Sequence, residues 1–208
     1  MKITPVVVAV ALVMALTGCR EGAPTVPAAA DGPLASALSA PLPGVSLPPG
    51  PLRPLVPAPD EVPPGMVPLL TASGPRDVAA IAAYSGDPAA AAAALTEHGF
   101  SSAYVVQYAD PAGARVLSVV VVRFADAVGA TADLTADLAG SSGDVVERER
   151  VGEASQVRRQ PLPGAGGGEL ATVRFRQGAT TWLLAYGDRP TADAAVAVRL
   201  GQLLAARA

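Results

Sequence analysis

The prolines of this chain are concentrated in one stretch. Of the 21 prolines, 15 lie between Arg20 and Pro75. Because proline fixes φ and lacks a backbone N–H donor, neither a helix nor an inner strand can persist through such a stretch. We therefore expect residues 19–75 to form an extended, disordered tether, and we expect the globular domain to be confined to residues 76–208.

The first residues have the pattern of a secretory signal. Lys2 supplies a positive charge, and an apolar run follows over residues 3–17. This run is shorter than the roughly 20 apolar residues that a membrane-spanning helix needs, so a signal peptide over residues 1–18 is expected. Cys19, the single cysteine of the chain, follows directly.

The segment Leu16-Thr17-Gly18-Cys19 resembles the lipobox of bacterial lipoprotein precursors. The resemblance implies transfer of diacylglycerol to the Cys19 thiol and cleavage between Gly18 and Cys19. The lipid on Cys19 would then anchor the protein in the outer face of the cytoplasmic membrane, so the membrane is an expected partner. An ordinary secreted protein with an unrelated cysteine is the alternative. The bias toward alanine and arginine with almost no lysine is typical of an actinobacterial protein.

Composition excludes several classes of site. One cysteine rules out an intrachain disulfide framework and any cysteine-rich metal site, and one histidine argues against a histidine-based metal centre. The net charge of -3 gives no reason to expect a nucleic-acid partner. We expect no cofactor.

Helix and strand signals alternate beyond the proline-rich stretch. Helices are expected over residues 77–84, 87–98, 126–138 and 191–204, and strands over 101–109, 115–125, 144–151, 171–176 and 180–186. Hairpins between helices predict an α+β domain, a mainly antiparallel sheet of about five strands with three to four helices. This element order, with the junction Phe124-Ala125-Asp126, resembles small domains of actinobacterial lipoproteins and sensor-kinase ectodomains. No site or activity is implied by that resemblance.

Candidate chemistry is limited to isolated features. His98 ends an alanine-rich helix, where a capping or solvated role is simpler than that of a catalytic base. Asp133 and Asp137 lie one turn apart on helix 126–138; they could form an acid pair or bind a hard cation, but we expect them on a solvated face. Segment 163–169 is glycine-rich but lacks the lysine and following helix of a phosphate loop, so a hairpin loop is expected.

Arginines are grouped along the later strands. The alternating charges of Glu147–Arg150 are typical of an exposed edge strand. If the strands pair, guanidinium groups could gather on one face and bind carboxylate, phosphate or lipid headgroups; a solvated face neutralised by glutamates is the alternative. The candidate anion-binding residues are Arg148, Arg150, Arg174 and Arg176.

Three functions remain open. The lack of a catalytic constellation favours a non-catalytic domain that binds a protein, glycan or small ligand outside the cytoplasmic membrane. The second function, a carrier of an apolar ligand or lipid, requires a cavity between sheet and helices. The aromatic residues expected to line that cavity are Tyr104, Tyr108, Phe124, Trp182 and Tyr186. The third is a hydrolase that uses Asp and Ser without His.

Overall fold

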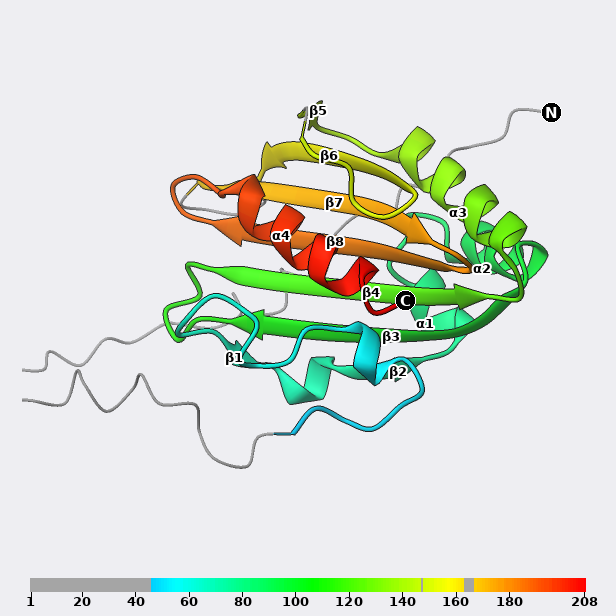
Figure 1. Cartoon of the computed structure of the whole chain (residues 1–208), viewed down its shortest axis with the longest axis horizontal. Helices are drawn as coiled ribbons and strands as arrows, with labels where there is room; N and C mark the ends of the chain where they lie inside the picture. Colours follow the sequence, from blue (N-terminus) through cyan, green and yellow to red (C-terminus); the bar gives the residue numbers. More distant parts are fainter. Residues whose placement is uncertain (1–45, 147, 163–166) are drawn as a thin grey trace, which may run out of the picture.

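A single antiparallel sheet organises the molecule. The computed structural model describes residues 46–146, 148–162 and 167–208. They form an eight-stranded sheet in the order β1-β3-β4-β8-β7-β6-β5, while β2 pairs with β3 beside β1 (Figure 1). The predicted α+β class and antiparallel sheet are confirmed. The predicted strand number was too low, because the sheet has eight strands rather than five.

Three of the eight strands were not predicted from the sequence, because their residues show little alternation between apolar and polar side chains. The strands are β1 (Val67–Pro68), β2 (Gly74–Arg76), β3 (Phe100–Ala109), β4 (Val116–Phe124), β5 (Asp144–Val145), β6 (Ala154–Pro161), β7 (Glu169–Gln177) and β8 (Thr180–Asp188). Strands β1 and β2 are two and three residues long and contain proline. In β6 only Val157 is buried, so its sequence shows no period of two. The edge strand expected over residues 144–151 is limited to β5.

Four α-helices accompany the sheet in the described residues. They are α1 (Val78–Ala82), α2 (Pro88–Glu97), α3 (Ala127–Gly140) and α4 (Ala194–Ala205), and two 3-10 turns lie at Arg53–Leu55 and Leu70–Ala72. An aspartate caps the N-terminus of every α-helix by accepting a backbone N–H bond in the first turn: Asp77, Asp87, Asp126 and Asp193. Local sequence therefore sets where each helix begins.

One face of the sheet bears the larger core. Helix α4 crosses this face (Figure 1), and its Leu200 and Leu204 are buried there. Trp182 of β8 stacks on Phe175 of β7, with ring centroids 4.8 Å apart and planes 3° from parallel. Trp182 is 2% exposed and belongs to this core.

Part of the proline-rich stretch completes this core. Residues 47–66, the N-terminal strap, run across the same face as α4. Their buried apolar side chains are Leu47, Leu52, Leu55, Val56, Val62 and Met66. Three aromatic side chains donate hydrogen bonds to strap carbonyls: Tyr104 Oη to Pro48 O (2.6 Å), Tyr108 Oη to Pro57 O (2.7 Å) and Trp182 Nε1 to Leu55 O (3.0 Å).

The structure thus differs from the expected boundary between tether and domain at residues 75 and 76. Proline prevents regular structure but leaves every carbonyl free to accept and every apolar side chain free to pack. The strap uses both properties. The rest of the expected tether, residues 19–45, lies outside the described residues.

The opposite face of the sheet is covered by two groups of helices. Helices α1 and α2 pack over β3 and β4, and α3 packs over β7 and β8. A smaller core lies under the first group, formed mainly by Ile81, Leu95, Val105, Val122 and Phe124. The space between the two groups is the site described next.

Candidate functional site

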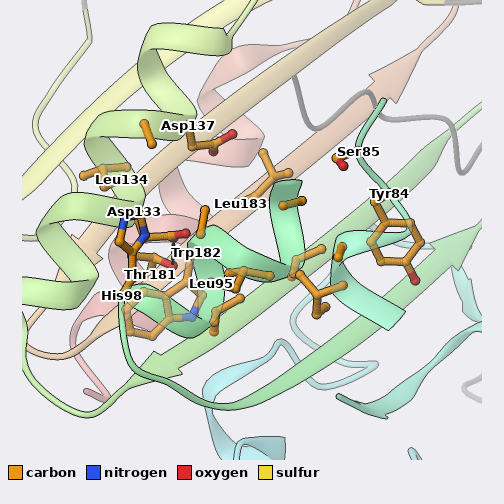
Figure 2. Close-up of a pocket in the computed structure, with 17 residues that line it drawn as sticks. Tyr84, Ser85, Leu95, His98, Asp133, Leu134, Asp137, Thr181, Trp182 and Leu183 are labelled. Atoms are coloured by element: carbon orange, nitrogen blue, oxygen red, sulfur yellow. Dashed lines mark hydrogen bonds between the residues drawn. The ribbon is translucent and has the colours of Figure 1, made fainter. Parts of the chain in front are cut away.

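A cavity of about 100 Å³ opens between α1, α2 and α3 (Figure 2). We call it the helix-side cavity. Its lining is mostly apolar, with Ile81, Leu95, Val120, Val122, Leu134 and Leu183 as the larger side chains. Five polar residues also line it: Ser85, His98, Asp133, Asp137 and Thr181. A small, mainly apolar hollow with a few polar groups is the usual form of a ligand site.

Strand register sets the floor of the helix-side cavity. Val122 of β4 lies opposite Thr181 of β8, and Val120 lies opposite Leu183. Residues opposite one another in an antiparallel pair point to the same face, so these four side chains share the helix side. Trp182 lies between them in sequence and points to the other face, where its indole meets the strap.

A close contact joins α3 to His98, a residue that lines the cavity. Gly129, in the first turn of α3, has so little room that a Cβ there would lie 1.9 Å from the carbonyl oxygen of His98. His98 is the residue that ends α2, as predicted. Asp133 follows Gly129 by four residues, so both lie on the same side of α3. Glycine at this position therefore allows His98 and Asp133 to line one cavity.

Asp133 is a carboxyl group of the site with a strongly raised pKa. Thr181 Oγ1 donates a hydrogen bond to Asp133 Oδ2 at 3.1 Å. Burial and, to a smaller extent, the negative charge of Asp137 raise the pKa of Asp133 to about 7, although the Thr181 bond acts in the opposite direction. A carboxyl group with this pKa exchanges its proton near neutral pH.

Asp137 is bound to an arginine from the sheet. Arg174 Nε donates to Asp137 Oδ2 at 2.5 Å, and the Arg174 side chain is only 7% exposed. Burial raises the pKa of Asp137, while Arg174 acts in the opposite direction. The expectation that Asp133 and Asp137 occupy a solvated face was wrong, because α3 turns both toward the sheet.

Two buried polar atoms at the helix-side cavity have no hydrogen-bond partner among the described residues. They are Ser85 Oγ and His98 Nδ1. Ser85 is 9% exposed and lies at the α1 side of the cavity, away from Asp133 and Thr181 (Figure 2). A buried polar atom left unpaired costs about 1–3 kcal/mol, so a ligand that pairs with it is favoured.

The candidate arginines are placed in two different environments. Arg174 and Arg176 share the helix-side face of β7, and each binds a carboxylate: Arg174 binds Asp137, and Arg176 Nη1 lies 2.5 Å from Glu153 Oε2. Arg148 and Arg150 are exposed in the segment between β5 and β6. The structure therefore brings together only the two arginines of β7, and both are engaged in ion pairs.

The aromatic residues expected to line a carrier cavity belong to the cores, and of the five only Trp182 is also among the residues that line the helix-side cavity. Tyr104, Tyr108, Trp182 and Tyr186 belong to the core beneath the strap and α4, and Phe124 belongs to the smaller core. The expectation that these five side chains together surround a ligand cavity was therefore wrong. The physical reason is the strap, whose apolar side chains occupy the space that such a cavity would need.

Several sequence predictions fall outside the described residues. These are the lipobox Leu16–Cys19, Glu147, and residues 163–166 of the glycine-rich loop. The strands on either side of that loop, β6 and β7, pair antiparallel, as a hairpin requires. Within the described ranges, no helix is both long and apolar enough to cross a bilayer.

Comparison with known proteins gives little similarity. No family model and no curated protein matches the chain. Among solved structures, the extracellular domain of PknH from Mycobacterium tuberculosis is similar over 55% of this chain and 68% of that chain. The TM-score is 0.45 and the sequence identity 11%, a level of likeness from which no function is transferred.

Proposed function

We propose that this chain is a lipid-anchored extracytoplasmic protein whose α+β domain binds a small ligand in the helix-side cavity without transforming it. The observation that carries this proposal is the cavity, an apolar hollow whose lining includes Ser85 and His98, two residues with a buried polar atom that has no partner among the described residues. Packed interiors rarely leave such a space together with unsatisfied polar groups. A ligand in this hollow would remove apolar surface from water.

The proposed anchor is the lipid on Cys19. The resemblance of residues 16–19 to a lipobox supports it, as does the position of the single cysteine. Because the strap belongs to the folded domain, we place the tether at residues 19–45 and the beginning of the domain near residue 46. The tether would separate the ligand-binding domain from the bilayer surface.

The size of the helix-side cavity favours a small ligand over a lipid. An apolar cavity of about 150 Å³ is known to hold benzene. At about 100 Å³, with one side open, this cavity suits a molecule of a few heavy atoms rather than a long acyl chain. The carrier of a lipid, one of the functions left open by the sequence, is therefore less well supported than a binder of a small molecule.

The arrangement of polar groups favours binding over hydrolysis. A hydrolase needs a nucleophile and its base within hydrogen-bond reach. Ser85 and Asp133 lie toward opposite ends of the cavity (Figure 2), and Asp137 is held by Arg174. Among these cavity residues, no serine hydroxyl lies next to a carboxylate that is free to act as its base.

Filling the cavity provides the test. Ala94 of α2 lines the cavity, whereas its neighbour Ala93 is exposed and does not. A library of small fragments is screened by thermal shift against the full-length protein, since a ligand raises stability by RT ln(1 + [L]/Kd). We expect fragments to stabilise the wild type and Ala93→Phe but not Ala94→Phe. Equal stabilisation of all three proteins would place the ligand elsewhere and overturn the proposal.

A further inference from the structure

We infer that the ligand of the helix-side cavity is a small organic cation, an amine with a short apolar body, whose ammonium group pairs with Asp133. This inference rests on the proposed ligand site and adds the chemical class of the ligand. It follows from the distribution of charge around the cavity, from the hydrogen-bond acceptors within it and from its apolar walls.

The arginines of β7 are both bound by carboxylates other than Asp133. Helix α3 contributes Asp133 and Asp137, and β7 contributes Arg174 and Arg176. Arg174 is bound by Asp137, and Arg176 is bound by Glu153. The titratable group facing the cavity from α2 is His98, whose Nδ1 has no partner among the described residues. Neither β7 arginine is therefore left to pair with an ionised Asp133 in the part of the cavity that the structure describes.

A bound ammonium group would supply a positive partner for Asp133. Without one, burial and the charge of Asp137 keep a proton on Asp133 near neutral pH, because they raise its pKa to about 7. A primary amine, with a pKa near that of lysine at about 10.4, carries its own proton throughout this range. Binding would then release the Asp133 proton and form a buried, charge-assisted hydrogen bond in its place.

The other polar atoms of the cavity suit a donor ligand. An ammonium group has hydrogen-bond donors only, and the hydroxyl oxygen of Thr181, which lies next to Asp133, can accept one of them. An anionic ligand would bring further acceptors toward Asp133 and Asp137, while both β7 arginines are already engaged.

The apolar walls favour an organic cation over a metal ion. Leu95, Val122 and Leu183 would contact the hydrocarbon part of an amine. No group of three or more metal-ligating side chains is found within the described ranges. A chain of about four carbons matches a volume of about 100 Å³.

A matched set of probes tests the charge. n-Butylammonium, n-butanol and n-butyrate have the same carbon chain and differ in the polar end. Each is titrated at pH 8 into the full-length protein in dodecyl maltoside, with a blank titration into micelles, and binding is followed by amide chemical shifts. We expect n-butylammonium to bind at least tenfold more tightly than n-butanol, and n-butyrate to give no saturable shift.

Two further measurements connect the preference to Asp133. Asp133→Asn should abolish the preference for the amine and leave n-butanol binding unchanged, whereas Asp144→Asn, on the exposed strand β5, should preserve it. The affinity of the wild type for n-butylammonium should fall about tenfold from pH 8 to pH 6, because the pKa of Asp133 is about 7. This pH profile decides the question even if Asp133→Asn fails to fold.

The outcomes separate the two proposals. If n-butanol or n-butyrate binds in the cavity as tightly as the amine, the cation inference is overturned and the ligand site stands. A flat pH profile for n-butylammonium also overturns it. If none of the probes binds and no fragment stabilises the wild type, both proposals fail.

Discussion

Replacing Asp133 with asparagine should make the protein more stable, and the gain should grow with pH. Asparagine keeps the shape of the side chain and an oxygen that accepts the Thr181 bond, but it cannot ionise. In the wild type, the pKa of Asp133 is about 7 in the folded state, against 3.8 for an unperturbed carboxyl group. The folded wild type therefore holds a proton that the unfolded chain has lost between these two values.

The sign and size of the effect follow from proton linkage. Where the folded state binds more protons than the unfolded state, stability falls as pH rises, here from about pH 4 to about pH 7. The slope is about 1.4 kcal/mol per pH unit for a single proton. From pH 5 to pH 8 the free energy of unfolding of the wild type should fall by about 3 kcal/mol because of Asp133, and that of Asp133→Asn should not show this fall. A domain typically has 5–15 kcal/mol in total, so the effect is large.

Urea unfolding at pH 5 and pH 8 measures this difference. Other titrating groups are common to both proteins, so the change in their stability difference isolates Asp133. The control is Asp144→Asn, because Asp144 is exposed and its replacement should give no pH-dependent gain. A stability difference between Asp133→Asn and wild type that stays constant from pH 5 to pH 8 would refute the buried, proton-holding role of Asp133.

Three other changes test the strap, the helix contact and the anchor. Leu52→Ala in the strap should cost about 2–5 kcal/mol in urea unfolding, whereas Leu70→Ala, at a side chain 43% exposed, should change stability by less than about 0.5 kcal/mol. Gly129→Ala should destabilise the protein by about 1–3 kcal/mol, although alanine has the better helix propensity, because the new Cβ meets a carbonyl oxygen. Gly86→Ala, where a Cβ has open space, is the control. Equal stabilities of the two variants would contradict the close contact at Gly129. Cys19→Ala should lose palmitate labelling and leave the membrane fraction, and unchanged detergent partitioning would exclude the lipid anchor.

The elements that sequence predicts well are those whose pattern depends on their own residues. Strand β4 is apolar on both faces, a pattern that indicates the inside of a sheet, and β3 and β8 enclose it. The alternation along β7 separates Val173 and Phe175, which enter the core, from Arg174 and Arg176 on the opposite face. Each helix begins after an aspartate that caps it, and local sequence carries that signal as well.

The features that sequence did not reveal depend on contacts between distant segments. The strap has no periodic apolar face, and it is ordered because Tyr104, Tyr108 and Trp182 present donors to its carbonyls from two strands far along the chain. The same is true of Asp133 and Asp137. Their spacing showed a common helix face, but only the approach of α3 to β7 and β8 turns that face inward. Long-range packing overrides the local expectation in both cases.

The location of the bound ligand is the most direct test of the helix-side cavity. Amide chemical shifts of the full-length protein, recorded while n-butylammonium is added, report which residues the ligand approaches. We expect the largest changes at Ile81, Leu95 and Leu183, which line the cavity, and we expect Ala94→Phe to remove them. Saturable changes confined to the exposed edge at Val67 and Leu70, with the cavity residues unmoved, would contradict it.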